Sequence, residues 1–233
     1  MVERPEHRLA LALLSSLDAP LLREAACWFA GGTAVSLRCG EYRVSRDVDL
    51  LCATREGYRR LREVVFDRGL RGLFTRDMKS LREVRTDRYG IRAVVEVDGV
   101  AMKIEIVSEG RIALAGMADP ELPVARLTDE DLVAEKLLAN ADRFLDDSAL
   151  GRDALDLILL RHHLGELPES AREKARGAYG DSIDRALERG VQRLRDQPKL
   201  LSRALATLDV LPAAREVILE HLATLPPTPD ETA

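Results

Sequence analysis

A glycine pair followed by two closely spaced aspartates is the feature that most constrains this chain. The apolar run 25–30 is broken at Gly31 and Gly32, and Asp47 follows Gly32 by 15 positions, with Asp49 two residues later. Adjacent glycines let a backbone approach a phosphate and direct its N–H groups toward it. Side chains alternate across a strand, so the two carboxylates share one face. The combination predicts a place that holds a divalent cation and a nucleoside triphosphate.

Each half of this pattern has an ordinary alternative. A Gly-Gly pair is most often a turn, and Asp-x-Asp is commonly a strand end that meets water. The spacing joins the two halves, because it leaves room for a short helix over 33–38 and a return loop into a neighbouring strand. The polar and glycine residues at this place are the nucleotide-binding candidates: Gly31, Gly32, Thr33, Ser36, Ser45 and Arg46. Arg46 has a second interpretation, in which it balances the charge of the aspartates.

A third carboxylate is predicted from a hairpin. Residues 91–97 and 100–107 flank Asp98-Gly99, a strong signal for a tight turn between two strands. On the second strand Glu105 faces away from Ile104 and Ile106. If this strand lies beside the Asp47 strand, Glu105 joins Asp47 and Asp49 as a metal ligand. The alternative of equal weight is an exposed strand acid.

Charge and cysteine content narrow the function classes. The net charge of −5 gives no overall sign of nucleic-acid binding, but residues 55–92 hold twelve basic against six acidic side chains. That segment either attracts phosphates or forms a solvated helix face. The three cysteines have no metal-ligand spacing and fit a reducing cytoplasm. The apolar run 9–14 is too short to cross a membrane, so we expect neither secretion nor membrane insertion.

The pattern along the chain predicts an α+β fold. We expect an N-terminal domain over 1–125, with a mixed β-sheet flanked by helices, then a helical bundle over 126–225 and a disordered tail over 226–233. Helices are predicted over 7–26 with a break at 18–20, over 55–68 behind the N-cap Thr54, and over 129–144 behind the N-cap Thr128. Further helices are predicted over 152–160, 168–178, 181–195, 199–208 and 213–222, whereas 70–89 has no clear assignment and 108–126 is predicted to be irregular.

Together with residues on these predicted helices, the glycine and aspartate motifs resemble those of a known family. The residues that carry the resemblance are Gly31-Gly32-Thr33-Ala34, Arg43, Ser45-Arg46-Asp47-Val48-Asp49-Leu50, Lys136, Arg152-Asp153 and Asp156. They resemble the AbiEii/AbiGii-type nucleotidyltransferase toxins, including those of MenAT-type systems, within the polymerase-beta-like superfamily. The resemblance covers about residues 25–160, and its third acid is a glutamate where many relatives have aspartate. It implies a nucleoside triphosphate donor, Mg²⁺ or Mn²⁺ and a cognate antitoxin, and for several members of the family the 3′ end of tRNA as acceptor.

Four residues are predicted to be catalytic: Asp47, Asp49, Lys136 and Asp153. Lys136 would neutralise a donor phosphate, although a solvated helix lysine is the alternative without the resemblance. Asp153 would act as a base or orient Lys136, but an aspartate in a first helical turn is also favoured by the helix dipole. His162 and His163 adjoin an apolar helix without metal-ligand spacing, so they are assigned structural roles.

The leading hypothesis is a toxin that transfers a nucleoside monophosphate from a nucleoside triphosphate to tRNA and releases pyrophosphate. A second hypothesis keeps this chemistry but makes a protein side chain the acceptor. A third is a non-catalytic module that binds a nucleotide or a partner. The apparent presence of all three carboxylates argues against the third.

Overall fold

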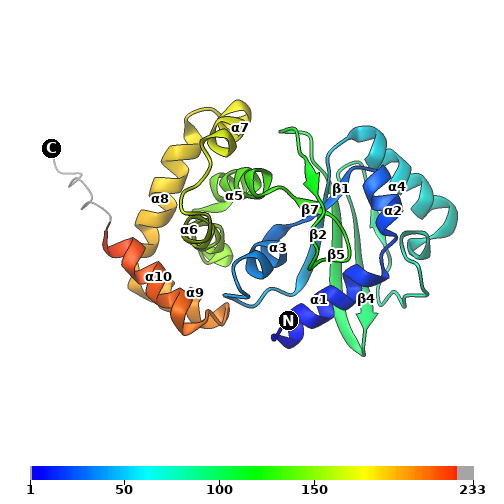
Figure 1. The fold of residues 1–233 in the computed structure, drawn as a ribbon, viewed down its shortest axis with the longest axis horizontal. Coiled ribbons are helices and arrows are strands. Elements are labelled where there is room, and N and C mark those ends of the chain that lie inside the picture. The colour runs from blue at the N-terminus through cyan, green and yellow to red at the C-terminus, as the bar shows by residue number, and fades with distance from the viewer. Residues whose placement is uncertain (1, 225–233) are drawn as a thin grey trace. The chain divides into compact units, whose positions relative to one another are not determined.

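The computed structural model describes residues 2–224 and divides the chain into two compact units, Met1–Leu132 and Val133–Ala233. The division falls inside the helix α5 (Asp129–Arg143), which begins where the Thr128 hydroxyl accepts a hydrogen bond from the Asp131 amide. Figure 1 shows the strands in the first unit and a set of helices in the second.

The first unit alternates helices and strands. Its helices before α5 are α1 (Pro5–Ser16), α2 (Ala19–Glu24), α3 (Gly31–Arg38), α4 (Arg55–Arg68) and the short 3₁₀ turn η1 (Leu70–Leu73). Its strands are β1 (Cys27–Ala30), β2 (Asp47–Cys52), β3 (Arg85–Thr86), β4 (Gly90–Val97), β5 (Val100–Ser108), β6 (Gly116–Met117) and β7 (Arg126–Leu127).

These strands form one mixed sheet in the order β3-β4-β5-β2-β1-β7-β6. β2 runs antiparallel to β1 and parallel to β5, while β4 and β5 pair as an antiparallel hairpin. The parallel pair brings two segments together that are far apart in the sequence, because residue 49 is level with residue 105. The fold is therefore α+β with a mixed sheet, as predicted.

One face of the central strands is apolar and holds much of the core. Val48 and Leu50 of β2 and Ile104 and Ile106 of β5 are buried there, next to each other in register. Helix α4 contacts both strands and presents its own buried residues, among them Leu61. The alternate residues of β2 and β5 face the other way, which leaves that side of these strands available for polar groups.

Most predicted elements of the first unit are present, with shifted ends. The predicted helix 55–68 has the same limits as α4, and the Thr54 hydroxyl accepts a hydrogen bond from the Gly57 amide. The hairpin turns at Asp98-Gly99 as expected. Segment 70–89, which has no clear sequence pattern, contains the two-residue strand β3. The segment predicted to be irregular, 108–126, contains β6 and the first residue of β7, and strands of two residues are too short to leave a pattern in the sequence.

The second unit is helical. After α5 it contains the 3₁₀ turn η2 (Asp147–Ala149), α6 (Arg152–Leu164), α7 (Glu169–Tyr179), α8 (Ser182–Asp196), α9 (Pro198–Thr207) and α10 (Pro212–Ala223). Helix α8 contacts α6, α7, α9 and α10. The predicted division before Arg126 would separate β7 from the sheet, whereas β7 pairs with β1 in the first unit. The predicted tail 226–233 lies outside the described residues.

Candidate active site

Two carboxylates project from the polar face of β2. Asp47 is level with Lys103 of β5 and Asp49 is level with Glu105, so strand pairing puts the three predicted acids on one face. The side chain of Asp47 is 51% exposed, and Asp49 is partly buried. Carboxylates at a surface that is still open to solvent can accept a cation and a charged substrate together.

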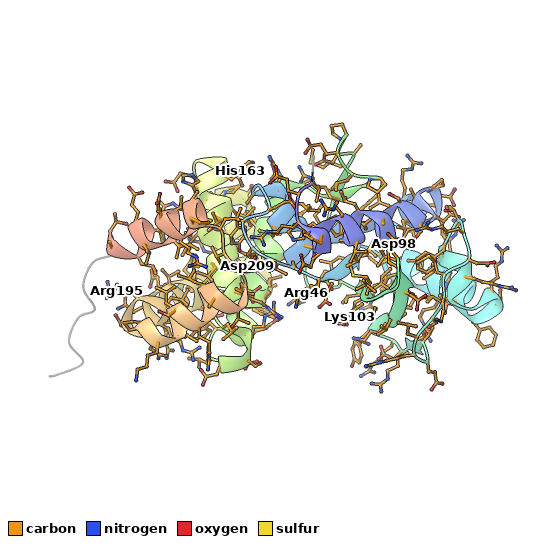
Figure 2. All side chains as sticks on the ribbon, turned by 90° about the horizontal axis from the view of Figure 1, so that it is seen from below. Arg46, Asp98, Lys103, His163, Arg195 and Asp209 are labelled. Carbon is orange, nitrogen blue, oxygen red and sulfur yellow. The ribbon has the colours of Figure 1, made fainter. Side chains whose placement is uncertain are left out.

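Glu105 is held by two basic side chains. Its carboxylate lies 2.5 Å from Arg92 Nε and 2.9 Å from Lys103 Nζ, and Lys103 Nζ lies 3.9 Å from Asp47 Oδ2. Burial alone would raise the pKa of Glu105, but Lys103 and Arg92 outweigh it and lower the pKa. Lys103 and Arg46 lie on the same side of the first unit (Figure 2). Basic side chains therefore lie among the carboxylates on this face of the sheet.

Among residues 2–224, no group of three or more His, Cys, Asp or Glu side chains is arranged to hold a metal ion. Glu105 shares a face with the two aspartates, but its oxygens are occupied by Arg92 and Lys103. The three-carboxylate ligand set stays a prediction, and within it Asp47 and Asp49 differ from Glu105, whose two oxygens are paired with basic side chains.

The glycine pair forms the first turn of α3 beside Asp49. Gly31 has φ +74°, and a Cβ built there would lie 2.7 Å from Asp49 Cβ, well inside van der Waals contact. A Cβ at Gly32 would lie 2.6 Å from the guanidinium of Arg43. The first N–H groups of a helix have no partner within the helix and attract anions. This turn thus combines close packing against the aspartates with the backbone donors that a phosphate needs.

The loop that leads into β2 is held by hydrogen bonds of three hydroxyl groups, those of Thr33, Ser36 and Ser45. The Thr33 hydroxyl lies 2.9 Å from Ser45 Oγ and 2.5 Å from the Asp47 carbonyl oxygen, and the Ser36 hydroxyl donates to the Arg43 carbonyl oxygen at 2.6 Å. Thr33 and Ser36 are both 0% exposed. The prediction that these two hydroxyls hold a triphosphate is therefore replaced by a role in positioning Asp47.

Arg43 and Arg46 occupy different surroundings in the same loop. Arg43 is 3% exposed, and its guanidinium donates to the Tyr42 hydroxyl and to the Val44 carbonyl. Arg46 is exposed and lies 3.4 Å from Glu6 of α1. Arg46 is thus the arginine of this loop that an incoming phosphate can reach from solvent.

Lys136 of α5 lies at the centre of a buried ion-pair cluster in the second unit. Its Nζ is 3.0 Å from Asp153 and 2.6 Å from Asp156, both on α6. The Arg143 guanidinium also binds Asp153, with donor distances of 2.6 and 2.9 Å. The alternative of a solvated lysine is therefore wrong, because Lys136 is 5% exposed.

The cluster also fixes the ionisation of Asp153. Burial alone would raise the pKa of Asp153, but Lys136 and Arg143 outweigh it and hold the pKa well below the usual range. A carboxylate with so low a pKa is a poor general base near neutral pH. Of the two predicted roles for Asp153, the geometry favours orienting Lys136. His162 and His163 are exposed at the end of α6.

Three residues near the carboxylates were missed by sequence reasoning. Lys103 and Arg92 stand on the polar faces of β5 and β4, where strand alternation could have identified them. His7 is 0% exposed on α1 and contacts the loop before β2. Nothing in the local pattern around His7 distinguishes it from a core histidine.

A family model matches most of the chain. Residues 12–231 match the family described as nucleotidyl transferase AbiEii toxin, type IV toxin–antitoxin system. No curated protein matches the sequence. The solved structures that are similar to the chain include the following two. An antigenic nucleotidyltransferase-like protein from Paracoccidioides brasiliensis is 16% identical, with 86% of this chain and 94% of that chain covered and a TM-score of 0.48. JHP933 from Helicobacter pylori is 15% identical, with coverages of 84% and 96% and a TM-score of 0.35.

No helix among the described residues is long and apolar enough to cross a membrane.

Proposed function

Because the chain belongs to the AbiEii family of nucleotidyltransferase toxins from type IV toxin–antitoxin systems, we propose that it transfers a nucleoside monophosphate from a nucleoside triphosphate to RNA. The proposed acceptor is the 3′ end of tRNA. The oxygen of an acceptor hydroxyl forms a bond to the α-phosphorus and its proton passes to solvent, while the bond from the α-phosphorus to the bridging oxygen breaks and pyrophosphate leaves. The observation that carries the proposal is the contact of the Gly31 turn with Asp49 at the start of α3.

Asp47 and Asp49 are the proposed ligands of a divalent cation. Mg²⁺ is commonly bound through one or two carboxylates together with substrate phosphates, and two carboxylates on one strand face fit that donor set. When bound there, Mg²⁺ or Mn²⁺ would supply positive charge to the reacting phosphate and the leaving pyrophosphate.

The chain's own groups bind and orient the donor. The N–H groups of the Gly31-Gly32 turn, which have no acceptor within α3 at the start of the helix, receive the triphosphate, and Arg46 approaches it from the solvent side. Ser45, Thr33 and Ser36 keep the loop before Asp47 in place through their hydrogen bonds. The role of Lys136 in neutralising a donor phosphate stays a prediction, and within the second unit its ammonium group is held by Asp153 and Asp156.

The proposed RNA surface is the arginine-rich segment 55–92. Arg55 and Arg62 are exposed on α4, whereas the arginines of α7 are paired with acids, such as Arg172 and Arg176 with Asp184. Replacing Arg55 and Arg62 by glutamate should weaken tRNA binding and reduce its dependence on salt concentration by about one or two phosphate contacts. Equal salt dependence in the wild type and the variant would move the RNA surface elsewhere.

The test is transfer of label from each of the four α-³²P nucleoside triphosphates to total tRNA with Mg²⁺. Asp47→Asn removes a proposed ligand, and Asp98→Asn makes the same change in the hairpin turn as a matched control. We expect label with the wild type and the control, and at least about a hundredfold less with Asp47→Asn. Label in protein but not in tRNA would favour a protein acceptor. No label in either would favour a non-catalytic binding module.

The family also implies a cognate antitoxin. We propose that expression of the wild type without it arrests growth and that Asp47→Asn relieves the arrest. Growth arrest that persists in Asp47→Asn would separate toxicity from the proposed transfer.

A further inference from the structure

His7 of α1 connects the first helix to the loop before the two aspartates. Its imidazole is 0% exposed, with Nδ1 2.8 Å from Glu41 Oε1 and Nε2 3.3 Å from the Ser45 backbone nitrogen. The Ser45 amide can only donate, so Nε2 must accept. Nδ1 therefore carries the proton and donates it to the Glu41 carboxylate.

Glu41, which accepts the hydrogen bond from His7 Nδ1, also binds the residues just before α1. Its carboxylate accepts hydrogen bonds from the amides of Glu3 at 2.7 Å and Arg4 at 3.1 Å, besides that of His7. Arg4 Nε donates to the Glu41 carbonyl at 2.8 Å. Glu41 itself has φ +57°, a conformation that needs support from its surroundings. The N-terminal end of α1 thus holds the loop at Glu41 and, through His7, at Ser45.

The held segment bears directly on the candidate active site. Ser45 lies two residues before Asp47, and its hydroxyl and the Asp47 carbonyl both meet the Thr33 hydroxyl in the first turns of α3. His7 fixes the loop on the α1 side, and Thr33 fixes it on the α3 side. The loop between them sets the direction in which β2 begins, and so the position of both carboxylates relative to the glycine turn.

We propose that His7 is a positioning residue for the nucleotidyl transfer, and that its acceptor bond from the Ser45 amide holds Asp47 in its reactive place. The inference rests on the proposed function for its catalytic part. The hydrogen bonds of the His7 ring go to Glu41 and to the Ser45 backbone and not to Asp47 or Asp49, so His7 acts through the loop.

Two substitutions separate the two ring nitrogens. His7→Asn keeps an amide donor near the position of Nδ1, so it can still bind Glu41 but cannot reach Ser45. His7→Gln is longer and places an amide oxygen near the position of Nε2, where it can accept from the Ser45 amide. His162→Asn, at an exposed position on α6, is the matched control.

Hydrogen exchange of the Ser45 amide reports the link without any assay of activity. We expect exchange about fivefold faster in His7→Asn, and close to the wild-type rate in His7→Gln and His162→Asn. In the transfer assay His7→Asn should lower kcat about tenfold with little change in KM for the nucleotide, and His7→Gln should restore most of the loss. Equal losses in both variants, or unchanged Ser45 exchange in His7→Asn, would overturn the proposal.

The outcomes keep the two proposals apart. If the wild type labels no acceptor, the proposed function fails and the catalytic role of His7 with it, while the exchange rates still decide whether His7 holds the loop. If neither variant folds, the ¹⁵N chemical shifts of the His7 ring in the wild type decide instead. The proposal requires a protonated Nδ1 and an unprotonated Nε2, and the opposite tautomer would refute it.

Discussion

Asp49 and Glu105 are directly level on the parallel strands β2 and β5, yet their carboxylates are used differently. Asp49 packs against the glycine turn, whereas Glu105 is bound by Arg92 and Lys103. Strand register alone would make the two residues equivalent ligands. The basic side chains on the neighbouring strand positions make them unequal.

This difference predicts that neutralising Glu105 and neutralising Asp49 will change the affinity for a divalent cation to different extents. Glu105→Gln should leave Mn²⁺ affinity, measured by electron paramagnetic resonance of the free ion, within about threefold of the wild type. Asp49→Asn should weaken it by about tenfold or more, because a neutral amide replaces a ligand. Equal weakening in both variants would show that Glu105 belongs to the ligand set.

Gly31→Ala should lower the free energy of unfolding by more than the strain of a positive φ alone would. Gly31 and Gly40 have φ values of +74° and +69°, but a Cβ meets nothing within 4 Å at Gly40 and overlaps Asp49 at Gly31. Gly40→Ala should lower the free energy of unfolding by about 1 kcal/mol. Gly31→Ala should lower it further in urea unfolding, and should also displace Asp49 and reduce transfer by about tenfold. If the two variants behave alike, the contact with Asp49 has no consequence.

Lys136→Met should destabilise the second unit strongly. It leaves Asp153 and Asp156 buried without the ammonium group, a change that typically costs about 3–5 kcal/mol. Arg161→Met breaks an exposed pair with Glu166 and should cost no more than about 1 kcal/mol. Urea unfolding of both variants makes the comparison, and similar small losses would mean that the cluster is not stabilising.

The burial of His7 predicts a loss of stability in mild acid. Burial lowers the pKa of His7, and nearby Arg4 and Arg43 act in the same direction against the raising effect of Glu41. Below about pH 6.5 the unfolded chain takes up a proton at His7 that the folded chain resists. The stability from this residue is therefore complete above that pH and is lost as the pH falls through the folded value, by at most about 1.4 kcal/mol per pH unit.

His7→Gln has no titrating ring, so its free energy of unfolding should depend less on pH than that of the wild type. Urea unfolding at several values between about pH 7.5 and 5 makes the comparison. Parallel pH profiles for the two proteins would show that other groups cause the acid sensitivity.

Local chemistry explains what the sequence could predict. Thr54 as N-cap and Gly69 after the last turn define α4, and Asp98-Gly99 defines the hairpin, because these signals act over a few residues. The alternation on β2 and β5 likewise predicted that Asp47, Asp49 and Glu105 share a face.

What the sequence could not predict depends on distant partners. The polar stripe of α5 looks like a solvated face until the buried acids of α6 meet Lys136. Thr33 and Ser36 look like phosphate ligands until the loop before β2 returns to receive their hydroxyls. The role of His7 depends on Glu41 and Ser45, which are distant in the sequence and contact its ring only in the folded chain.

The pairing of β2 with β5 also has a consequence for how the protein is made. Asp49 is synthesised 56 residues before its partner Glu105, and at about 5–20 residues per second a ribosome needs several seconds to cover that interval. During this time β2 has no neighbour on one side, and Asp49 lacks the strand that completes its surroundings. A nascent chain therefore emerges with its aspartates in place in the sequence but without the assembled sheet, and the proposed toxicity should begin only after β5 has left the ribosome.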